Sequence, residues 1–367
     1  MYKDDNFRTH FNNFVFITFI ASKYLIFIFI LLISKLLKLN RKKMRAVIPV
    51  AGVGTRLRPH TYTLPKVLLN VAGKPILGHI LDSVISQGIE RITIVTGYMG
   101  KLVQDYVTRN YNIDVSFISQ RDSLGLGHAI WVASETFESE PLMIILGDTI
   151  FDLDLNLAQK SNYSSIGVKL VDDPRRFGVV VLNNQNFVTK FVEKPQKPVS
   201  NLAIVGLYYI KETELLKKSL KKLIDEDIRT KDEYQLTDAL QLMLNEGEKF
   251  TTFPVDGWYD CGKSETLLST NRFLLEQSSQ SRNLKDVVII PPVFIDDNAV
   301  VQRSVIGPYA TVAREAHVKD SVIRDTIVSD GATVENTLLE QSIIGNNAIV
   351  KGNFYHLNVG NSSEVNL

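Results

Sequence analysis

Two glycines and two basic residues between positions 52 and 66 have the clearest chemical meaning in this sequence. Gly52 and Gly54 follow the apolar run 46–50, and Arg56 and Lys66 come shortly after them. Glycine has no side chain to block close approach, so this loop can bring backbone N–H groups to a phosphate. The two cations add positive charge at the same place. The stretch therefore predicts a polyphosphate site that follows a buried strand.

The positions of the glycines and basic residues exclude two other kinds of phosphate-binding loop. A dinucleotide-binding G-x-G-x-x-G loop needs a third glycine where Leu57 stands. A Walker A loop ends in Gly-Lys-Ser/Thr, which Thr55 and Arg56 do not supply. For the two glycines alone, an ordinary turn with surface cations remains an alternative. The whole string from Gly52 to Lys66 is more specific.

The elements expected to position this loop alternate between strands and helices over residues 44–150. Short apolar runs at 92–95, 115–118 and 142–146 read as strands. A helix is expected from Pro75 to just before Gly88. Such alternation favours an α/β, Rossmann-like, mostly parallel sheet covered by helices, which binds its ligands at the carboxyl ends of strands.

The chain changes character twice after residue 150. Residues 167–210 are richer in strands, with a turn expected at Asn183 and Asn184, and residues 211–247 are helical and charged. Beyond about 285 an Ala-x-Val pattern recurs every 16 residues, and Ser/Thr followed by two aliphatics keeps the same register. This period predicts a β-solenoid with inward-facing aliphatics.

The net charge and the cysteine content indicate which partners and which cellular compartment suit this chain. The 367 residues carry a net charge of +1, with eight Lys/Arg and two Asp in residues 1–43, so the remainder is net negative. A negative body is a poor general ligand for nucleic acid, and we expect no such partner. The single cysteine, Cys261, excludes an internal disulfide and fits a reducing compartment. We expect a cytoplasmic catalytic part.

The first 43 residues form an apolar and basic extension. Residues 14–33 contain one charge, Lys23, and are long enough to span a bilayer, with a cluster of Lys and Arg after them. No small-residue cleavage site follows, which argues against a cleaved secretory signal. Met44 lies directly before the first strand, so we expect synthesis to start there. A genuine membrane anchor, with the catalytic part in the cytoplasm, is the alternative.

Seven segments carry polar or glycine-rich motifs in a fixed order: 52–59 with Pro65-Lys66, 73–76, Gln120 with 124–129, 146–148, 191–195, 236–239 and 257–262. In these segments and their order the sequence resembles the sugar-1-phosphate nucleotidyltransferases, or nucleotide-sugar pyrophosphorylases. The resemblance covers about residues 44–275, and a C-terminal left-handed β-helix is common in the longer members. It implies domains at 44–283 and 284–367.

The implied reaction joins a nucleoside triphosphate to a sugar 1-phosphate and releases pyrophosphate. Arg56 and Lys66 would act on the phosphates as catalytic residues, Arg56 at the leaving pyrophosphate and Lys66 between the attacking and α-phosphate oxygens. The implied nucleotide-binding residues are Ala51, Gly52, Gly54, Thr55, Gln120 and Gly125. Gly178, Glu193 and Lys194 would hold the sugar phosphate, although a structural turn explains Gly178 almost as well.

Asp148 and Asp260 would hold Mg²⁺ by the same resemblance. Magnesium binds a couple of carboxylates together with phosphate oxygens and waters. An isolated aspartate after a strand is otherwise more often a turn or cap residue. We interpret His128 as a helix-start residue near the base pocket and Cys261 as a packed thiol.

The segments that resemble particular members of the family favour a nucleotide with a pyrimidine base. Residues 124–129 resemble uridylyltransferases, whereas residues 201–206 and 258–260 resemble thymidylyltransferases, so UTP and dTTP both stay open. Lys231 and Asp232 stand where relatives often carry arginine or glycine, which leaves an extra phosphate contact in doubt. We expect glucose 1-phosphate as substrate and a homo-oligomer formed through the solenoid.

Two alternatives remain, one an enzyme with a second activity and the other a protein of another class. A bifunctional enzyme would also transfer an acyl group on its solenoid, but only His317 and His356 lie in that region as candidate bases. A non-catalytic regulatory subunit would keep the fold and lose site residues. Lys66, Asp148, Lys194 and Asp260 are all present, which favours an enzyme.

Overall fold

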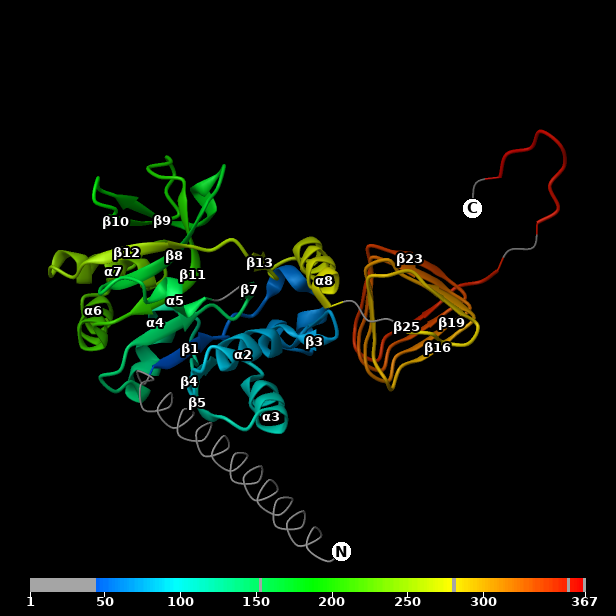
Figure 1. Cartoon of the computed structure of the whole chain (residues 1–367), viewed down its shortest axis with the longest axis horizontal. Helices are drawn as coiled ribbons and strands as arrows, with labels where there is room; N and C mark the ends of the chain where they lie inside the picture. The colour runs from blue at the N-terminus through cyan, green and yellow to red at the C-terminus, as the bar shows by residue number, and fades with distance from the viewer. Residues whose placement is uncertain (1–43, 152–153, 279–281, 355–356, 366–367) are drawn as a thin grey trace, which may run out of the picture. The chain divides into compact units, whose positions relative to one another are not determined.

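The computed structural model describes residues 44–151, 154–278, 282–354 and 357–365. It has a mixed α/β sheet with helices, followed by a stack of short strands (Figure 1). This is the predicted fold class. The predicted boundary at 283/284 falls between helix α8 (Ser264–Ser278) and strand β14 (Val287–Ile289). Within the described ranges no helix is long and apolar enough to cross a membrane. Residues 14–33, the possible anchor, lie outside them.

The parallel half of the sheet contains the four strands that the apolar runs predict. They are β1 (Arg45–Pro49), β4 (Arg91–Thr96), β5 (Asp114–Ser119) and β6 (Leu142–Ile145), in the spatial order β6-β1-β4-β5. Ala46 and Ile48 pack on one face of β1 and Val47 on the other. Strands buried on both faces are typical of parallel sheets, whose carboxyl ends then share one edge.

The sheet continues with antiparallel strands. The antiparallel strands are β8 (Ser164–Leu170), β9 (Gly178–Leu182), β10 (Val188–Glu193) and β11 (Leu202–Ile210), and β12 (Phe250–Pro254) runs parallel to β8. Strand β11 runs antiparallel to β6 and also pairs with β9 and β8. The turn predicted at Asn183 and Asn184 joins the antiparallel pair β9 and β10, and the Asn183 carboxamide accepts bonds from the backbone N–H groups of Gln185 and Phe187.

Helices cover both faces of the sheet (Figure 1). Helices α2 (Ile76–Ser86) and α3 (Gly100–Asn110) belong to one apolar cluster, and α4 (Leu126–Ala133), α6 (Thr213–Asp225) and α7 (Leu236–Asn245) to the other. The predicted helix from Pro75 begins one residue later, because Pro75 ends the short strand β3 (Lys74–Pro75). The short elements near the site are β2 (Asn70–Val71), β7 (Thr149–Phe151), α5 (Leu155–Ala158) and β13 (Trp258–Asp260).

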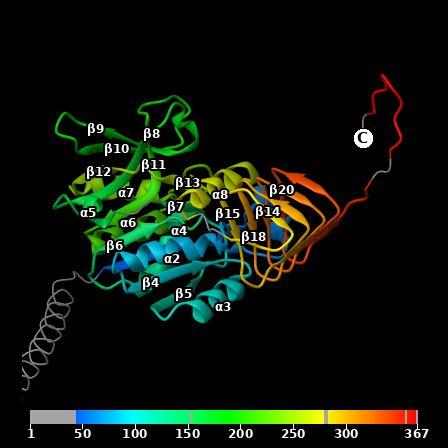
Figure 2. The same ribbon diagram turned by 45° about the vertical axis from the view of Figure 1, so that its right-hand side comes forward.

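The solenoid consists of three parallel sheets whose coils stack with a triangular cross-section (Figures 1 and 2). This arrangement is consistent with the predicted left-handed β-helix. The inward aliphatics of successive coils, such as Ile306 and Ile323, are fully buried. The sheets are β14 (Val287–Ile289), β17 (Ser304–Ile306), β20 (Val322–Arg324), β23 (Leu338–Glu340); β15 (Val293–Ile295), β18 (Ala310–Val312), β21 (Ile327–Val328), β24 (Ile343–Ile344); and β16 (Val300–Gln302), β19 (His317–Lys319), β22 (Thr333–Glu335), β25 (Ile349–Lys351).

Candidate functional site

The glycine loop follows β1 at the carboxyl edge of the sheet. Gly54 has a φ of 68°, in the left-handed region that glycine adopts readily. A Cβ there would lie 2.9 Å from Cβ of Lys66, so a larger residue would displace the lysine. The Thr61 hydroxyl donates to the Gly54 carbonyl at 2.8 Å and fixes the loop. Gly52 is exposed and lies beside the Lys66 ammonium, since a Cβ on Gly52 would be 3.8 Å from Nζ.

Lys66 is paired with the first predicted metal ligand. Its Nζ donates to Asp148 Oδ2 at 2.7 Å, and Asp148 Oδ1 accepts from the Thr149 hydroxyl at 3.3 Å. Burial favours the neutral acid of Asp148, but the charge of Lys66 and its hydrogen bond outweigh burial and lower the pKa of the carboxyl. Asp148 is therefore ionised at neutral pH.

The second predicted metal ligand, Asp260, lies on the strand next to Asp148. Strand β13 pairs with β7 so that Asp260 faces Thr149, and the Cys261 N–H donates to the Asp148 carbonyl at 3.0 Å. Asp260 Oδ1 accepts from the Gly262 N–H at 2.9 Å. A Cβ on Gly262 would lie 3.4 Å from a guanidinium nitrogen of Arg56. The structure thus brings the glycine loop, Arg56 and both aspartates together.

These carboxylates fit the predicted magnesium site. Across the described ranges no three His, Cys, Asp or Glu side chains gather to hold a metal, so an ion at Asp148 and Asp260 would have two carboxylates from the protein. Mg²⁺ suits such a site, because it keeps several waters and takes phosphate oxygens alongside one or two carboxylates. The Lys66 ammonium already occupies one oxygen of Asp148 as a counter-charge.

The predicted base-binding residues come from the loop after β5. Gln120 is 6% exposed, and its N–H donates to the Thr96 carbonyl at the end of β4. Its Nε2 lies 3.1 Å from the Gly125 carbonyl and 3.0 Å from Nδ1 of His128. Gly125 has a φ of 105°, and a Cβ there would lie 2.7 Å from the Tyr234 carbonyl. Glycine is therefore needed here for packing, apart from any contact with a base.

The predicted sugar-phosphate residues cluster at the end of β10. Glu193 faces Gly178 across the β9–β10 pair and lies 3.2 Å from the Lys194 ammonium. Gly178 begins a strand, so the alternative that it forms a turn is wrong. A Cβ at Gly178 would lie 3.1 Å from Glu193 Oε2 and 3.0 Å from the Thr237 methyl group.

Three residues near these groups have no substrate contact assigned to them in the prediction from the motifs. The Thr237 hydroxyl donates to Glu193 Oε2 at 2.9 Å, and Lys231 Nζ donates to the Lys194 carbonyl at 3.2 Å. His128, the third residue of α4, contacts Gln120. Each contact joins segments far apart in sequence or depends on helix geometry, so spacing alone does not reveal it. Thr237 lies in a family segment, which is the available signal.

One tyrosine near the site is buried on β11. Burial raises the pKa of the Tyr208 hydroxyl, and the negative charges of Glu193 and Asp148 raise it further.

Cys261 is fully buried. Burial raises its pKa to about 12, and its thiol lies 3.8 Å from the Thr270 hydroxyl. It is the packed thiol that the sequence predicts.

The strand ends of this sheet hold a glycine loop, a lysine and two neighbouring aspartates, as expected for a nucleotide-binding transferase. The family model described as nucleotidyl transferase matches residues 45–277. The chain belongs to this family, and it is an enzyme of the sugar-1-phosphate nucleotidyltransferase class. The predicted family is thereby confirmed.

Three comparisons show the range of similarity. The UTP–glucose-1-phosphate uridylyltransferase AglF of Haloferax volcanii is 31% identical over 247 residues, which are 65% of this chain and 99% of the relative. The glucose-1-phosphate thymidylyltransferase of Streptomyces griseus is 27% identical over 332 residues, covering 82% and 92%. A crystal structure of UDP-glucose pyrophosphorylase complexed with UDP-glucose superimposes with a TM-score of 0.55 at 26% identity, covering 64% and 99%.

Proposed function

We propose that this enzyme transfers the nucleotidyl group of UTP or dTTP to glucose 1-phosphate, giving a nucleotide sugar and pyrophosphate. The observation that carries the proposal is the contact of Lys66 with Asp148, next to Asp260 and Arg56. Glu193 and Lys194 lie further along the sheet at a second anion-binding position. The similarity to a uridylyltransferase and a thymidylyltransferase supports the two nucleotides and glucose 1-phosphate.

In the proposed mechanism the glycine loop and Arg56 bind the triphosphate. The Gly52 and Gly54 backbone can approach the phosphates closely, with Ala51 and Thr55 on either side of them. The exposed Arg56 guanidinium offers a planar pair of donors to the β- and γ-phosphates. Charge developing on the departing pyrophosphate is therefore met by a group held in place beforehand.

Lys194 and Glu193 hold the second substrate. Lys194 pairs with the phosphate of the sugar 1-phosphate, and Glu193, oriented by Thr237, accepts hydrogen bonds from sugar hydroxyls. A phosphate oxygen of the sugar then attacks the α-phosphorus in line. The bond from the α-phosphorus to the bridging oxygen breaks, and pyrophosphate leaves with that electron pair.

Lys66 contacts both the attacking and the α-phosphate oxygens, and no protein nucleophile or general base is required. Asp148 and Asp260 would hold Mg²⁺, which neutralises phosphate charge when it is bound. The protein's contribution is positioning and charge neutralisation.

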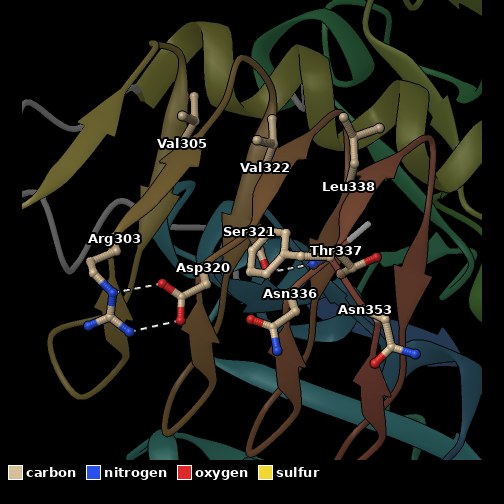
Figure 3. A pocket seen from close by; sticks show the side chains of 11 residues that line it. Arg303, Val305, Asp320, Ser321, Val322, Asn336, Thr337, Leu338 and Asn353 are labelled. Atoms are coloured by element: carbon tan, nitrogen blue, oxygen red, sulfur yellow. Dashed lines mark hydrogen bonds and ion pairs between the residues drawn. The ribbon is translucent and has the colours of Figure 1, made fainter. Parts of the chain in front are cut away.

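The proposal extends to assembly as a homo-oligomer. Val305, Val322 and Leu338 lie side by side on successive coils of one solenoid face (Figure 3). The charged side chains beside this ladder pair within the chain, Arg303 with Asp320 and Arg324 with Glu340. A second copy could therefore cover the aliphatics without burying an unpaired charge.

A cytoplasmic location of the enzyme stays a prediction.

Pyrophosphate release tests the proposed function. The wild-type chain is assayed with UTP, dTTP, CTP, GTP and ATP, each with several sugar 1-phosphates and Mg²⁺. We expect release with UTP or dTTP and glucose 1-phosphate, and its loss in the Lys66→Met variant. Absence of release with every pair would refute the enzyme assignment and favour a regulatory subunit.

A further inference from the structure

The carboxamide of Gln120 is held by two acceptors. Its Nε2 lies 3.1 Å from the Gly125 carbonyl and 3.0 Å from Nδ1 of His128. A carboxamide nitrogen has two hydrogens, and both are used by these contacts. The part of the Gln120 carboxamide that stays available to a ligand is therefore the oxygen Oε1, which can only accept hydrogen bonds.

Donation from Gln120 requires a particular form of His128. Nδ1 can accept only when it carries no proton, so the imidazole is neutral with its proton on Nε2. Burial lowers the pKa of His128 and favours this neutral form, although the nearby Asp122 carboxylate opposes the shift. The imidazole stacks on the ring of Tyr234, with centroids 6.3 Å apart.

The backbone around both acceptors is fixed. The Gly127 N–H donates to the Tyr234 carbonyl at 2.7 Å, and the Tyr234 N–H donates to the Leu124 carbonyl at 2.9 Å. A Cβ on Gly125 or Gly127 would approach the Tyr234 carbonyl within 2.7–2.8 Å. Residues 124–128 are therefore packed closely against the segment around Tyr234 and hydrogen-bonded to it. These contacts fix the positions of the Gly125 carbonyl and His128.

We propose that His128 is a positioning residue that keeps Oε1 of Gln120 directed at the base, so that the site selects pyrimidines with an N3–H group. The inference rests on the proposed function, which places the base at Gln120. Uracil and thymine carry a hydrogen on N3 and can donate to Oε1. Cytosine has an acceptor at N3, so two acceptors would face each other. Without His128, only the Gly125 carbonyl holds the carboxamide nitrogen, so the carboxamide rotates more readily and can present its NH₂ to cytosine.

The test compares UTP with CTP. The preference is the ratio of kcat/KM for UTP to kcat/KM for CTP, measured with glucose 1-phosphate. In His128→Ala we expect this ratio to fall roughly tenfold or more, the effect of one unpaired buried hydrogen-bonding group. The loss should appear as improved use of CTP together with a higher KM for UTP. His128→Phe keeps a ring against Tyr234 without an acceptor and should behave in the same way.

Two further variants separate positioning from a general structural effect. If His128 acts through Gln120, adding His128→Ala to Gln120→Ala should change the preference no further. His317→Ala, on an exposed solenoid position, is the matched control and should leave the ratio unchanged.

An unchanged ratio in both folded His128 variants would overturn the inference, as would an additional loss in the double variant. Failure of the wild-type chain to use UTP or dTTP gives a different result. It would refute the proposed function first, and the inference with it.

Discussion

At the scale of single residues, the contact between Lys66 and Asp148 holds two opposite charges where two substrates are expected to meet. The pair is partly buried: the Lys66 side chain is 12% exposed and that of Asp148 is 33% exposed. A partly buried carboxylate with a close cation stays ionised and keeps its geometry. Each group thus keeps the other in place until phosphates and a metal ion compete for them.

Replacing Asp148 by asparagine tests its proposed role. Asp148→Asn keeps the size of the side chain but removes the negative charge that would bind Mg²⁺ and pair with Lys66. We expect Mg²⁺-dependent turnover to fall at least about a hundredfold, the size of effect typical for losing a preorganised charged group. Circular dichroism should be unchanged. The control is Asp225→Asn, an exposed carboxylate on α6 that pairs with Lys221. Near-normal turnover in Asp148→Asn would refute the metal assignment.

Much of the candidate site could be predicted from the sequence, because its residues follow strand ends or lie in family segments. Arg56, Lys66, Asp148 and Asp260 come together as the motifs indicate. The contact of His128 with Gln120 could not be predicted in this way. It depends on the orientation of a side chain across eight residues and a helix start, and residue spacing carries no such information.

At the scale of elements, helix α8 connects the loop after β2 to the solenoid. Asn271 on α8 is fully buried, and its Oδ1 accepts from the Ala72 N–H at 2.8 Å and the Thr311 hydroxyl at 2.7 Å. Its Nδ2 donates to the Tyr309 carbonyl at 3.2 Å. One side chain thus satisfies three groups from two segments, the loop after β2 and residues 309–311 of the solenoid, and buried groups need such partners.

We predict a large loss of stability for Asn271→Ala. The change removes partners from an N–H, a hydroxyl and a carbonyl, and a buried group without a partner costs about 1–3 kcal/mol. The free energy of unfolding should fall by about 2–4 kcal/mol in total, because the cavity admits water to some of them. Urea unfolding provides the measurement. A loss no larger than that of Asn245→Ala, an exposed asparagine at the end of α7, would contradict the prediction.

The coils of the solenoid differ in length by one residue, so the repeat is longer at the start of the solenoid than the 16 residues found later. Val305 pairs with Val322, 17 residues on, whereas Thr311 pairs with Ile327, 16 residues on. The extra residue therefore lies in the corner 307–309, and the first coil has the same longer corner at 290–292. The sequence predicts the stacked strands from their aliphatic period. It does not predict the corners, since they have no such periodicity.

At the scale of the whole molecule, the aliphatic ladder is the surface proposed for self-association. Leu338 is 70% exposed and Val322 is 37% exposed on adjacent strands. We predict that the double variant Val322→Lys, Leu338→Lys is monomeric in sedimentation experiments, because lysines from two copies would repel each other and resist burial. Turnover should be retained.

Ile349→Lys provides a matched control for this ladder. Ile349 is 68% exposed, nearly as much as Leu338, but it lies on another solenoid face beside Thr333 and His317. It should leave the oligomer unchanged. Equal effects of the two sets of changes, or an oligomer that survives both, would contradict the assignment of this face.

Met44 gives a second prediction at this scale. It is 6% exposed and directly precedes β1, and the described contacts of Arg45 are with Glu140 and Thr93 inside the α/β part. A shortened chain that begins at Met44 should fold and retain full turnover, measured as pyrophosphate release. Loss of turnover in the shortened chain would favour a functional role for residues 1–43.

The central claim is that one site joins a pyrimidine nucleoside triphosphate to a sugar 1-phosphate. Phosphorus NMR of the wild-type enzyme with UTP or dTTP, glucose 1-phosphate and Mg²⁺ tests it most directly, because both products appear in one spectrum. We predict that one pyrophosphate forms per nucleotide sugar, so that the pyrophosphate signal grows as the sum of the two nucleotide-sugar phosphate signals while both substrates decline. Release of inorganic phosphate, or formation of pyrophosphate while glucose 1-phosphate stays constant, would contradict it.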